Sequence, residues 1–256
     1  MADFYTDQAQ GLRRLMGGTP FQVIGFAQSM EKIGQSTLIA NVALRLARLG
    51  RNVLIMDEHA DSENLGIAHY FGKPQVRVLQ SLTAHVRLLK VDSKSIQSPD
   101  FKRLFNIDPP IDIVLIDGAA GKISEWLLRA DEVILSVNAR SQAVSNAYQM
   151  IQSLSQNGVK HSQLFVNLVE NPKQAYFTFE KLSQTLQNRQ IAQLYSAGFL
   201  CFDPLIAQTV NTGKPFLKHH PDSQSAQIYY NFAENLQNMD ERRYANLDQF
   251  LERMTA

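Results

Sequence analysis

The sequence predicts an α/β protein with three layers, in which a mostly parallel, twisted sheet carries helices on both faces. From Pro20 onward, short apolar runs typical of buried strands alternate with segments of helical period. Two of these runs, NVLIMD and IDIVLID, end in a carboxylate, as strands at the functional edge of such sheets often do. The 256 residues suffice for one domain of this kind with a substantial core.

The composition excludes several classes of function. A formal net charge of +1 argues against a nucleic-acid-binding surface, which is usually strongly basic. The single cysteine, Cys201, permits no internal disulfide, fits a reducing compartment and excludes a self-contained iron–sulfur or Cys-rich zinc site. No apolar run approaches the roughly 20 residues that span a bilayer, and the N-terminus lacks a signal-peptide layout. We therefore expect a cytoplasmic protein.

The N-terminal residues 1–18 form the first predicted unit. Residues 6–16 (TDQAQGLRRLM) predict a short helix, with Thr6 or Asp7 as the N-cap and Arg13 and Arg14 in the last turn. The glycines and proline of residues 17–20 then act as a tether. From composition alone, a frayed chain end is favoured over a docking element.

The first core unit is a strand (FQVIGFA), a loop from Ser29 to Thr37, a helix from residue 36 to residue 50, and the strand that ends at Asp57. This is the βαβ setting of a phosphate-binding loop of the G-x-x-x-x-G-K-[ST] type. Ser29 takes the place of the first glycine and Gln35 that of the lysine, so only Gly34 and Ser36 match that pattern. Asp57 should lie beside the loop, at the carboxyl edge of the sheet.

The rest of the chain continues the alternation as one domain from residue 19 to residue 238. We expect helices at 64–71 and 76–89, a polar surface segment at 93–110, a strand ending at Asp117, three further strand–helix pairs, and a helix over about 223–237. Residues 239–256 predict a C-terminal amphipathic helix. Its polar face mixes acids with bases, which favours packing on protein over binding a membrane.

With these elements placed, the chain resembles the MinD/ParA group of deviant-Walker ATPases over nearly its whole length. The resemblance implies a P-loop NTPase fold of the SIMIBI/MinD type. Within the group, the chain is most similar to the flagellar-number regulators called FlhG or FleN. The resemblance depends on three segments: DQAxxLR at residues 7–13, NVALRLARLGRNVLIMD at residues 41–57, and the tail from FVNLV through CFDP to GKPF.

The DQAxxLR segment is the most specific of the three. It is similar to the helix through which these regulators engage and stimulate the flagellar SRP-type GTPase known as FlhF. The resemblance implies that this GTPase is a partner, and that the contact residues are Asp7, Gln8, Ala9, Leu12 and Arg13. Gln8 is expected near the catalytic site of the GTPase. Flagellar switch or regulatory proteins are further candidate partners, with recruitment to the cell pole. The helix at residues 6–16 is therefore interpreted as a docking element.

The nucleotide site of the family is largely replaced. Its signature lysine corresponds to Met30, its phosphate lysine to Gln35, two loop glycines to Glu31 and Lys32, and the second aspartate of its D-x-D motif to His59. The nucleotide-contact positions that are retained are Gly34, Ser36, Thr37, Asn167 and Asp203, and Asp57 and Asp117 stand as relics of the catalytic and magnesium-linked carboxylates.

These replacements predict a pseudo-ATPase. One cation about 4 Å from a phosphate contributes on the order of 4 kcal/mol at an effective dielectric near 20, so the loss of two lysines should weaken nucleotide binding by orders of magnitude. We expect no cofactor, with ATP and magnesium weak at best, and no metal, because no His/Asp pair at ligand spacing is evident beside His59. Ser36 and Thr37 are expected to cap the helix.

Two alternatives remain open from the sequence. One is a slow ATPase with a rebuilt loop, and the other is a pseudo-ATPase of another polar machine, such as a pilus or a polysaccharide secretion system. Family dimers sandwich nucleotide between two loops. Because Met30 and Gln35 replace the two lysines, we expect a monomer, or a dimer whose formation does not depend on ATP.

Overall fold

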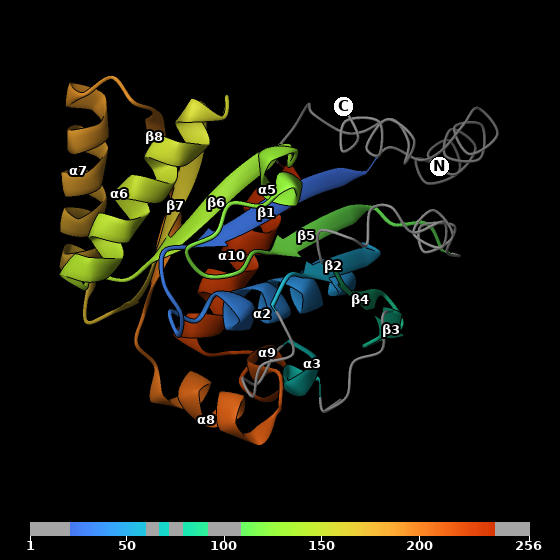
Figure 1. Cartoon of the computed structure of the whole chain (residues 1–256). Helices are drawn as coiled ribbons and strands as arrows, with labels where there is room; N and C mark the ends of the chain where they lie inside the picture. Colours follow the sequence, from blue (N-terminus) through green and yellow to red (C-terminus); the bar gives the residue numbers. More distant parts are fainter. Residues whose placement is uncertain (1–20, 60–66, 72–78, 92–108, 239–256) are drawn as a thin grey trace, which may run out of the picture.

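A computed structural model describes residues 21–59, 67–71, 79–91 and 109–238 (Figure 1). The N-terminal helix and tether (1–18) and the C-terminal helix (239–256) lie outside the described residues, and so do the predicted contact residues from Asp7 to Arg13. The central domain of the prediction can therefore be examined, whereas the two terminal segments stay predictions.

The middle layer of the described chain is an eight-stranded sheet in the order β3-β4-β2-β5-β1-β6-β7-β8 (Figure 1). Every neighbouring pair is parallel except β3 with β4 at one edge. The predicted fold class is confirmed. The strands are β1 (Gln22–Gln28), β2 (Val53–Asp57), β3 (Leu79–Ser81), β4 (Val86–Lys90), β5 (Ile113–Asp117), β6 (Glu132–Val137), β7 (His161–Val169) and β8 (Gln193–Cys201).

Helices cover both faces of the sheet (Figure 1). One face packs under α5 (Glu125–Leu128), α6 (Ser141–Gln156) and α7 (Pro172–Asn188), around a core that includes Trp126, Leu154 and Leu182. The other face packs under α2 (Gln35–Arg48), α3 (Ile67–Tyr70), α8 (Pro204–Thr212), α9 (Phe216–His219) and α10 (Gln224–Asn238). Because both faces are covered, the central strands β1, β2 and β5 are buried at every position and read as continuous apolar runs.

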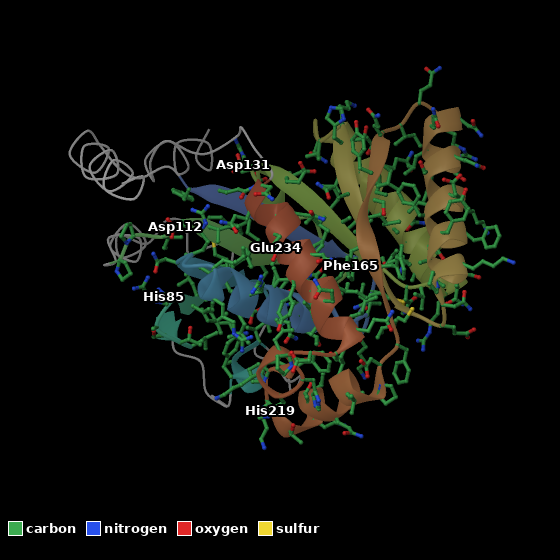
Figure 2. The ribbon with its side chains drawn as sticks, turned by 180° about the vertical axis from the view of Figure 1, so that it is seen from behind. His85, Asp112, Asp131, Phe165, His219 and Glu234 are labelled. Atoms are coloured by element: carbon green, nitrogen blue, oxygen red, sulfur yellow. The ribbon has the colours of Figure 1, made fainter. Side chains whose placement is uncertain are left out.

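Figure 2 shows the face on which α10 crosses the sheet, with Glu234 labelled on α10 and Phe165 on β7. Phe165 and Phe232 meet edge to face with ring centroids 5.1 Å apart, which joins α10 to the centre of the sheet. His85, Asp112 and Asp131 come just before β4, β5 and β6, so they mark the amino ends of these strands. The carboxyl ends lie at the opposite edge.

The helix predicted at residues 76–89 is wrong. The described part of this segment forms β3 and β4, and β4 pairs with β2 in parallel register. A short apolar run such as VRLL fits a buried strand as well as a helix, and periodicity alone does not separate the two. The helix predicted at 64–71 is present over Ile67–Tyr70. Within the described residues, no helix has both the length and the apolar content needed to span a bilayer.

Candidate functional site

The register of the sheet brings charged side chains together at its carboxyl edge. Asp57 at the end of β2 is the Cα partner of Lys90 on one side and of Asp117 on the other. Partners in a parallel register point to the same face, so backbone pairing alone places the three side chains in one row. Both carboxylates are buried, with exposed fractions of 1% for Asp57 and 0% for Asp117.

The loop between β1 and α2 lies over this row. Gly34 is the N-cap of α2 and adopts φ 81°, and a Cβ atom there would lie 2.7 Å from Asn167 Nδ2. Both the left-handed backbone and the close approach require glycine. The prediction that Ser36 and Thr37 cap the helix is wrong. Gly34 occupies the N-cap position, and Ser36 and Thr37 lie in the first turn of α2. Their hydroxyls bond elsewhere, Thr37 to the Tyr70 hydroxyl at 2.6 Å.

Asp117 is held by the first two side chains of α2. Gln35 Nε2 donates to Asp117 Oδ1 at 2.8 Å and also lies 3.2 Å from the carbonyl oxygen of Gly118 and 3.3 Å from that of Phe26. Ser36 Oγ donates to Asp117 Oδ2 at 2.7 Å. Burial raises the pKa of Asp117 to about 6 despite these donors. The glutamine at the family's lysine position is therefore a buried partner of this carboxyl group.

His59 lies between the two carboxylates. Its Nδ1 is 2.9 Å from Asp57 Oδ1 and 3.6 Å from Asp117 Oδ2, and the Gln28 amide donates to its Nε2 at 2.8 Å. Lys90 Nζ is 2.9 Å from Asp57 Oδ2 and donates to the carbonyl oxygen of His59 at 3.1 Å. Burial acts to raise the pKa of Asp57, but the His59 hydrogen bond and the Lys90 charge outweigh it and lower this pKa.

The histidine responds in the opposite direction. Burial acts to lower the pKa of His59, but the hydrogen bond to Asp57 and the charges of both aspartates outweigh it and raise this pKa. Burial also raises the pKa of the neighbouring Glu58. The cluster thus combines carboxyl groups whose pKa values shift in opposite directions with an imidazole and an ammonium group.

Asn167 and Asp203, the retained positions near the base in the family, make structural bonds. Asn167 Nδ2 donates to the carbonyl oxygen of Ile33 at 2.8 Å. Asp203 is the N-cap of α8: its Oδ1 accepts from the Leu205 amide at 2.9 Å, and its Oδ2 accepts from Ser225 Oγ at 2.6 Å. Both side chains stabilise loops at this edge.

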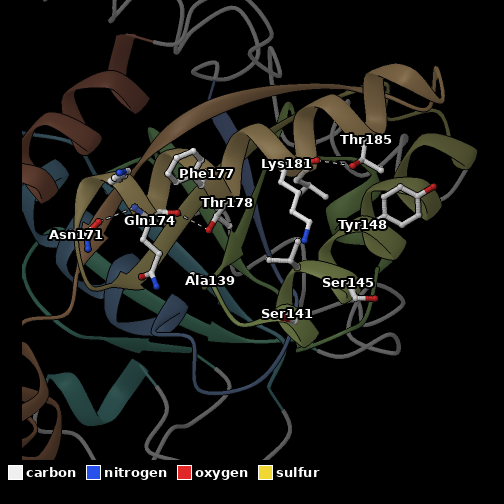
Figure 3. A pocket seen from close by; sticks show the side chains of 13 residues that line it. Ala139, Ser141, Ser145, Tyr148, Asn171, Gln174, Phe177, Thr178, Lys181 and Thr185 are labelled. Atoms are coloured by element: carbon white, nitrogen blue, oxygen red, sulfur yellow. Dashed lines mark hydrogen bonds between the residues drawn. The ribbon is translucent and has the colours of Figure 1, made fainter.

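A hollow of about 630 Å³ lies between α6 and α7, away from these residues (Figure 3). Figure 3 shows Tyr148 on α6, with Phe177 and Lys181 on α7, around the opening. None of the predicted site residues lines it. It is a surface groove lined by a mixture of apolar and polar side chains, with two lysines, Lys173 and Lys181.

Comparisons with known proteins agree with this architecture. No protein-family model matches the chain. The antiactivator FleN of Pseudomonas aeruginosa is 22% identical over 262 residues, which cover 92% of this chain and 94% of FleN. The MinD cell division protein of Aquifex aeolicus has the same fold, with a TM-score of 0.66 and 19% identity over 86% of this chain and 98% of MinD. The chain therefore has the fold of MinD and is similar in sequence to FleN.

A second solved structure, the MinD protein of Pyrococcus horikoshii in complex with Mg-ADP, matches with a TM-score of 0.64 and 17% identity over 86% of this chain and 97% of that one. In this chain, the side chains of the corresponding loop make contacts within the protein or face solvent. Gln35 is bonded to Asp117. Met30, at the signature-lysine position, packs against the core under α6 and α7. Glu31 and Lys32 are exposed, and Lys32 adopts φ 59° where the family has glycine.

Sequence reasoning missed three members of the site. Lys90 directly follows the segment at 76–89 that was expected to be helical, so its place at the end of strand β4 was not predicted. Gln28 ends β1 and matches no motif in the sequence, and its contact with His59 forms only in the folded chain. Nothing in the sequence indicates that the Tyr70 hydroxyl bonds to Thr37. The expectation that no potential metal ligand lies near His59 is wrong. Asp57 lies two residues before it, and Asp117 ends the neighbouring strand β5.

Proposed function

We propose that this chain is a nucleotide-independent MinD/ParA-family regulator of flagellar assembly, placement or number that acts through protein contacts. The observation that supports it is the Gln35–Asp117 hydrogen bond in the buried cluster. The amide stands where the family has a lysine for phosphate, and it bonds a carboxylate of its own chain. Phosphoryl transfer depends almost wholly on positioning and on charge stabilisation, and both are altered here.

The expected loss of affinity is large. Each lysine near a phosphate contributes on the order of 4 kcal/mol at an effective dielectric near 20, and about 1.4 kcal/mol corresponds to a factor of ten. Lys90 does not replace the lost lysines, because it pairs with Asp57. The retained Asn167 and Asp203 hold loops. Binding of Mg-ATP should therefore be millimolar or absent.

The flagellar part of the proposal is supported by the FleN relative and by the DQAxxLR segment at residues 7–13. Through that segment the chain would stimulate an SRP-type flagellar GTPase, with Gln8 near the catalytic site. Exposed aromatic side chains favour a protein-binding role, since such residues are enriched at interfaces. Tyr176 and Phe177 of α7 are 59% and 57% exposed, and Phe202 before α8 is 59% exposed.

The nucleotide part is tested by calorimetry of the full chain with Mg-ATP and Mg-ADP. We expect no measurable heat at micromolar protein, and light scattering that shows the same monomer or dimer with and without ATP. The control restores the family residues: Met30→Lys, Glu31→Gly, Lys32→Gly, Gln35→Lys and His59→Asp together should recover binding. Micromolar binding with hydrolysis by the unmodified chain would favour a slow ATPase instead.

The partner part is tested by the GTPase rate of the cognate flagellar SRP-type GTPase. The full chain should raise the rate, Gln8→Ala and removal of residues 1–18 should abolish the increase, and Gln10→Ala in the same segment should retain it. An unchanged rate with no detectable complex would contradict the flagellar assignment. Such a result would leave the calorimetric result standing and would direct attention to another polar machine.

A further inference from the structure

Asp57, His59 and Asp117 offer one ligand atom each within 4.8 Å of one another. His59 Nδ1 lies 2.9 Å from Asp57 Oδ1 and 3.6 Å from Asp117 Oδ2. In a tetrahedral zinc site with bonds of about 2.1 Å, neighbouring ligand atoms are about 3.4 Å apart. The two distances from His59 Nδ1 lie on either side of this value, and the two carboxylate oxygens lie within 4.8 Å of each other.

The far atom of each of these side chains is held by a different residue. Lys90 holds Asp57 Oδ2 at 2.9 Å, Gln35 holds Asp117 Oδ1 at 2.8 Å, and Gln28 contacts His59 Nε2 at 2.8 Å. Metal sites use such outer partners to orient their ligands. In this cluster Asp57 Oδ1 and Asp117 Oδ2 face His59 Nδ1, and they also accept from the His59 backbone amide at 2.9 Å and from Ser36 Oγ at 2.7 Å, respectively.

The charges of the cluster fit a divalent cation. Asp57 and Asp117 are buried carboxylates, and Lys90 Nζ lies 2.9 Å from Asp57 Oδ2. His59 lies between the two carboxylates and can ligate a metal as a neutral imidazole. A divalent ion placed among these side chains would offset buried negative charge, which is otherwise costly.

We propose that Asp57, His59 and Asp117 bind a divalent transition metal of the zinc type, without nucleotide. An imidazole ligand favours zinc, cobalt or nickel over magnesium, which prefers an all-oxygen shell. Ser36 Oγ, 2.7 Å from Asp117 Oδ2, or a water molecule would complete four-fold coordination. This differs from a magnesium ion held through nucleotide phosphates, since all three ligands here come from the chain.

Metal binding at His59 requires the other tautomer of the neutral ring. When His59 Nδ1 ligates a metal, its Nε2 carries the ring proton, and the Gln28 amide turns so that its oxygen accepts. The bound ion would connect the end of β2 to the start of α2 through Asp117 and Ser36. Such a link would stabilise the loop region at the edge where the family holds nucleotide.

The test is calorimetry of the full chain, stripped with a chelator, against Zn²⁺ and separately against Mg²⁺, together with the visible spectrum of the Co²⁺-loaded chain. We expect one tight zinc equivalent, no tight magnesium equivalent, and tetrahedral cobalt absorption. His59→Gln and Asp57→Asn should abolish the tight equivalent and the cobalt absorption. Gln28→Ala should weaken zinc binding by about 10 to 100-fold.

The matched control is His85→Gln, which removes an exposed histidine at the amino end of β4 and should leave the tight equivalent unchanged. Circular dichroism must show that His59→Gln stays folded, and Asp57→Asn provides an independent second variant. The proposal is overturned if the chain binds no tight zinc equivalent. It is also overturned if the folded His59→Gln and Asp57→Asn variants bind zinc as the unmodified chain does. That result would show that the zinc binds to histidines on the surface instead.

Discussion

The phosphate side and the base side of the family's nucleotide position are built differently in this chain. On the phosphate side, Gln35 and His59 replace the family residues, and the new side chains bond to the retained Asp117 and Asp57. On the base side, Asn167 keeps the family's residue type but supports the carbonyl oxygen of Ile33. The comparison shows that residue identity at a family position does not reveal its role, because the partners in the folded chain decide it.

The largest expected effect tests the phosphate side. Gln35→Ala removes the donor to Asp117 Oδ1 and leaves a cavity at a residue that is 1% exposed. We expect a loss of about 2 to 4 kcal/mol in the free energy of unfolding, measured by urea titration. Gln152→Ala on the exposed face of α6 is the matched control and should change it by less than about 0.5 kcal/mol. A loss below about 1 kcal/mol at Gln35 would contradict a structural role for the amide.

The second test asks whether the base side now supports the loop. Gly34→Ala places a methyl group 2.7 Å from Asn167 Nδ2 at φ 81°, which should cost about 1 to 3 kcal/mol. Asn167→Ala removes the bond to the Ile33 carbonyl oxygen and should cost a similar amount. The double variant should cost less than the sum by about 0.5 kcal/mol or more, because the clash partner is gone. Strict additivity in urea titrations would show that the two sites do not interact.

A smaller effect is expected at Asp203. Asp203→Ala removes the N-cap of α8 and the acceptor for Ser225, for a loss of about 1 to 2 kcal/mol in thermal or urea unfolding. Asp222→Ala, at an exposed acid three residues before Ser225, should be close to neutral. Equal losses in the two variants would indicate a general charge effect instead of capping.

The smallest effect is expected at Thr37. Thr37→Val keeps the shape of the side chain and removes its bond with the Tyr70 hydroxyl, so about 1 kcal/mol should be lost. Thr185→Val on the exposed face of α7 serves as the matched control. If unfolding midpoints of the two variants coincide, the Thr37–Tyr70 bond contributes no net stability.

The sequence predicted the sheet well where strands are buried on both faces. β1, β2 and β5 are continuous apolar runs whose only plausible place is the centre of a parallel sheet. It failed at β3 and β4, because a three-residue strand and a five-residue strand are too short for periodicity to separate them from a helix. The antiparallel pair of strands at this edge of the sheet was missed for the same reason.

The site was predicted in part. The ends of strands in parallel sheets meet at one edge, so the proximity of Asp57 to the loop followed from the pattern alone. The replacements at Met30, Gln35 and His59 could be read as losses of lysine and aspartate. That Met30 would pack on the core and Gln35 would bond Asp117 could not be read, because both contacts need the folded loop.

The amino-acid sequence alone settles the alternation of strands and helices and the absence of lysine at residues 30 and 35. These are local properties of hydrophobic period and residue type. The row of Lys90, Asp57 and Asp117 was decided by the tertiary structure, because it depends on the register between strands that are distant in the chain. The position of His59 between two carboxylates has the same origin, since one of them lies 58 residues further along the chain.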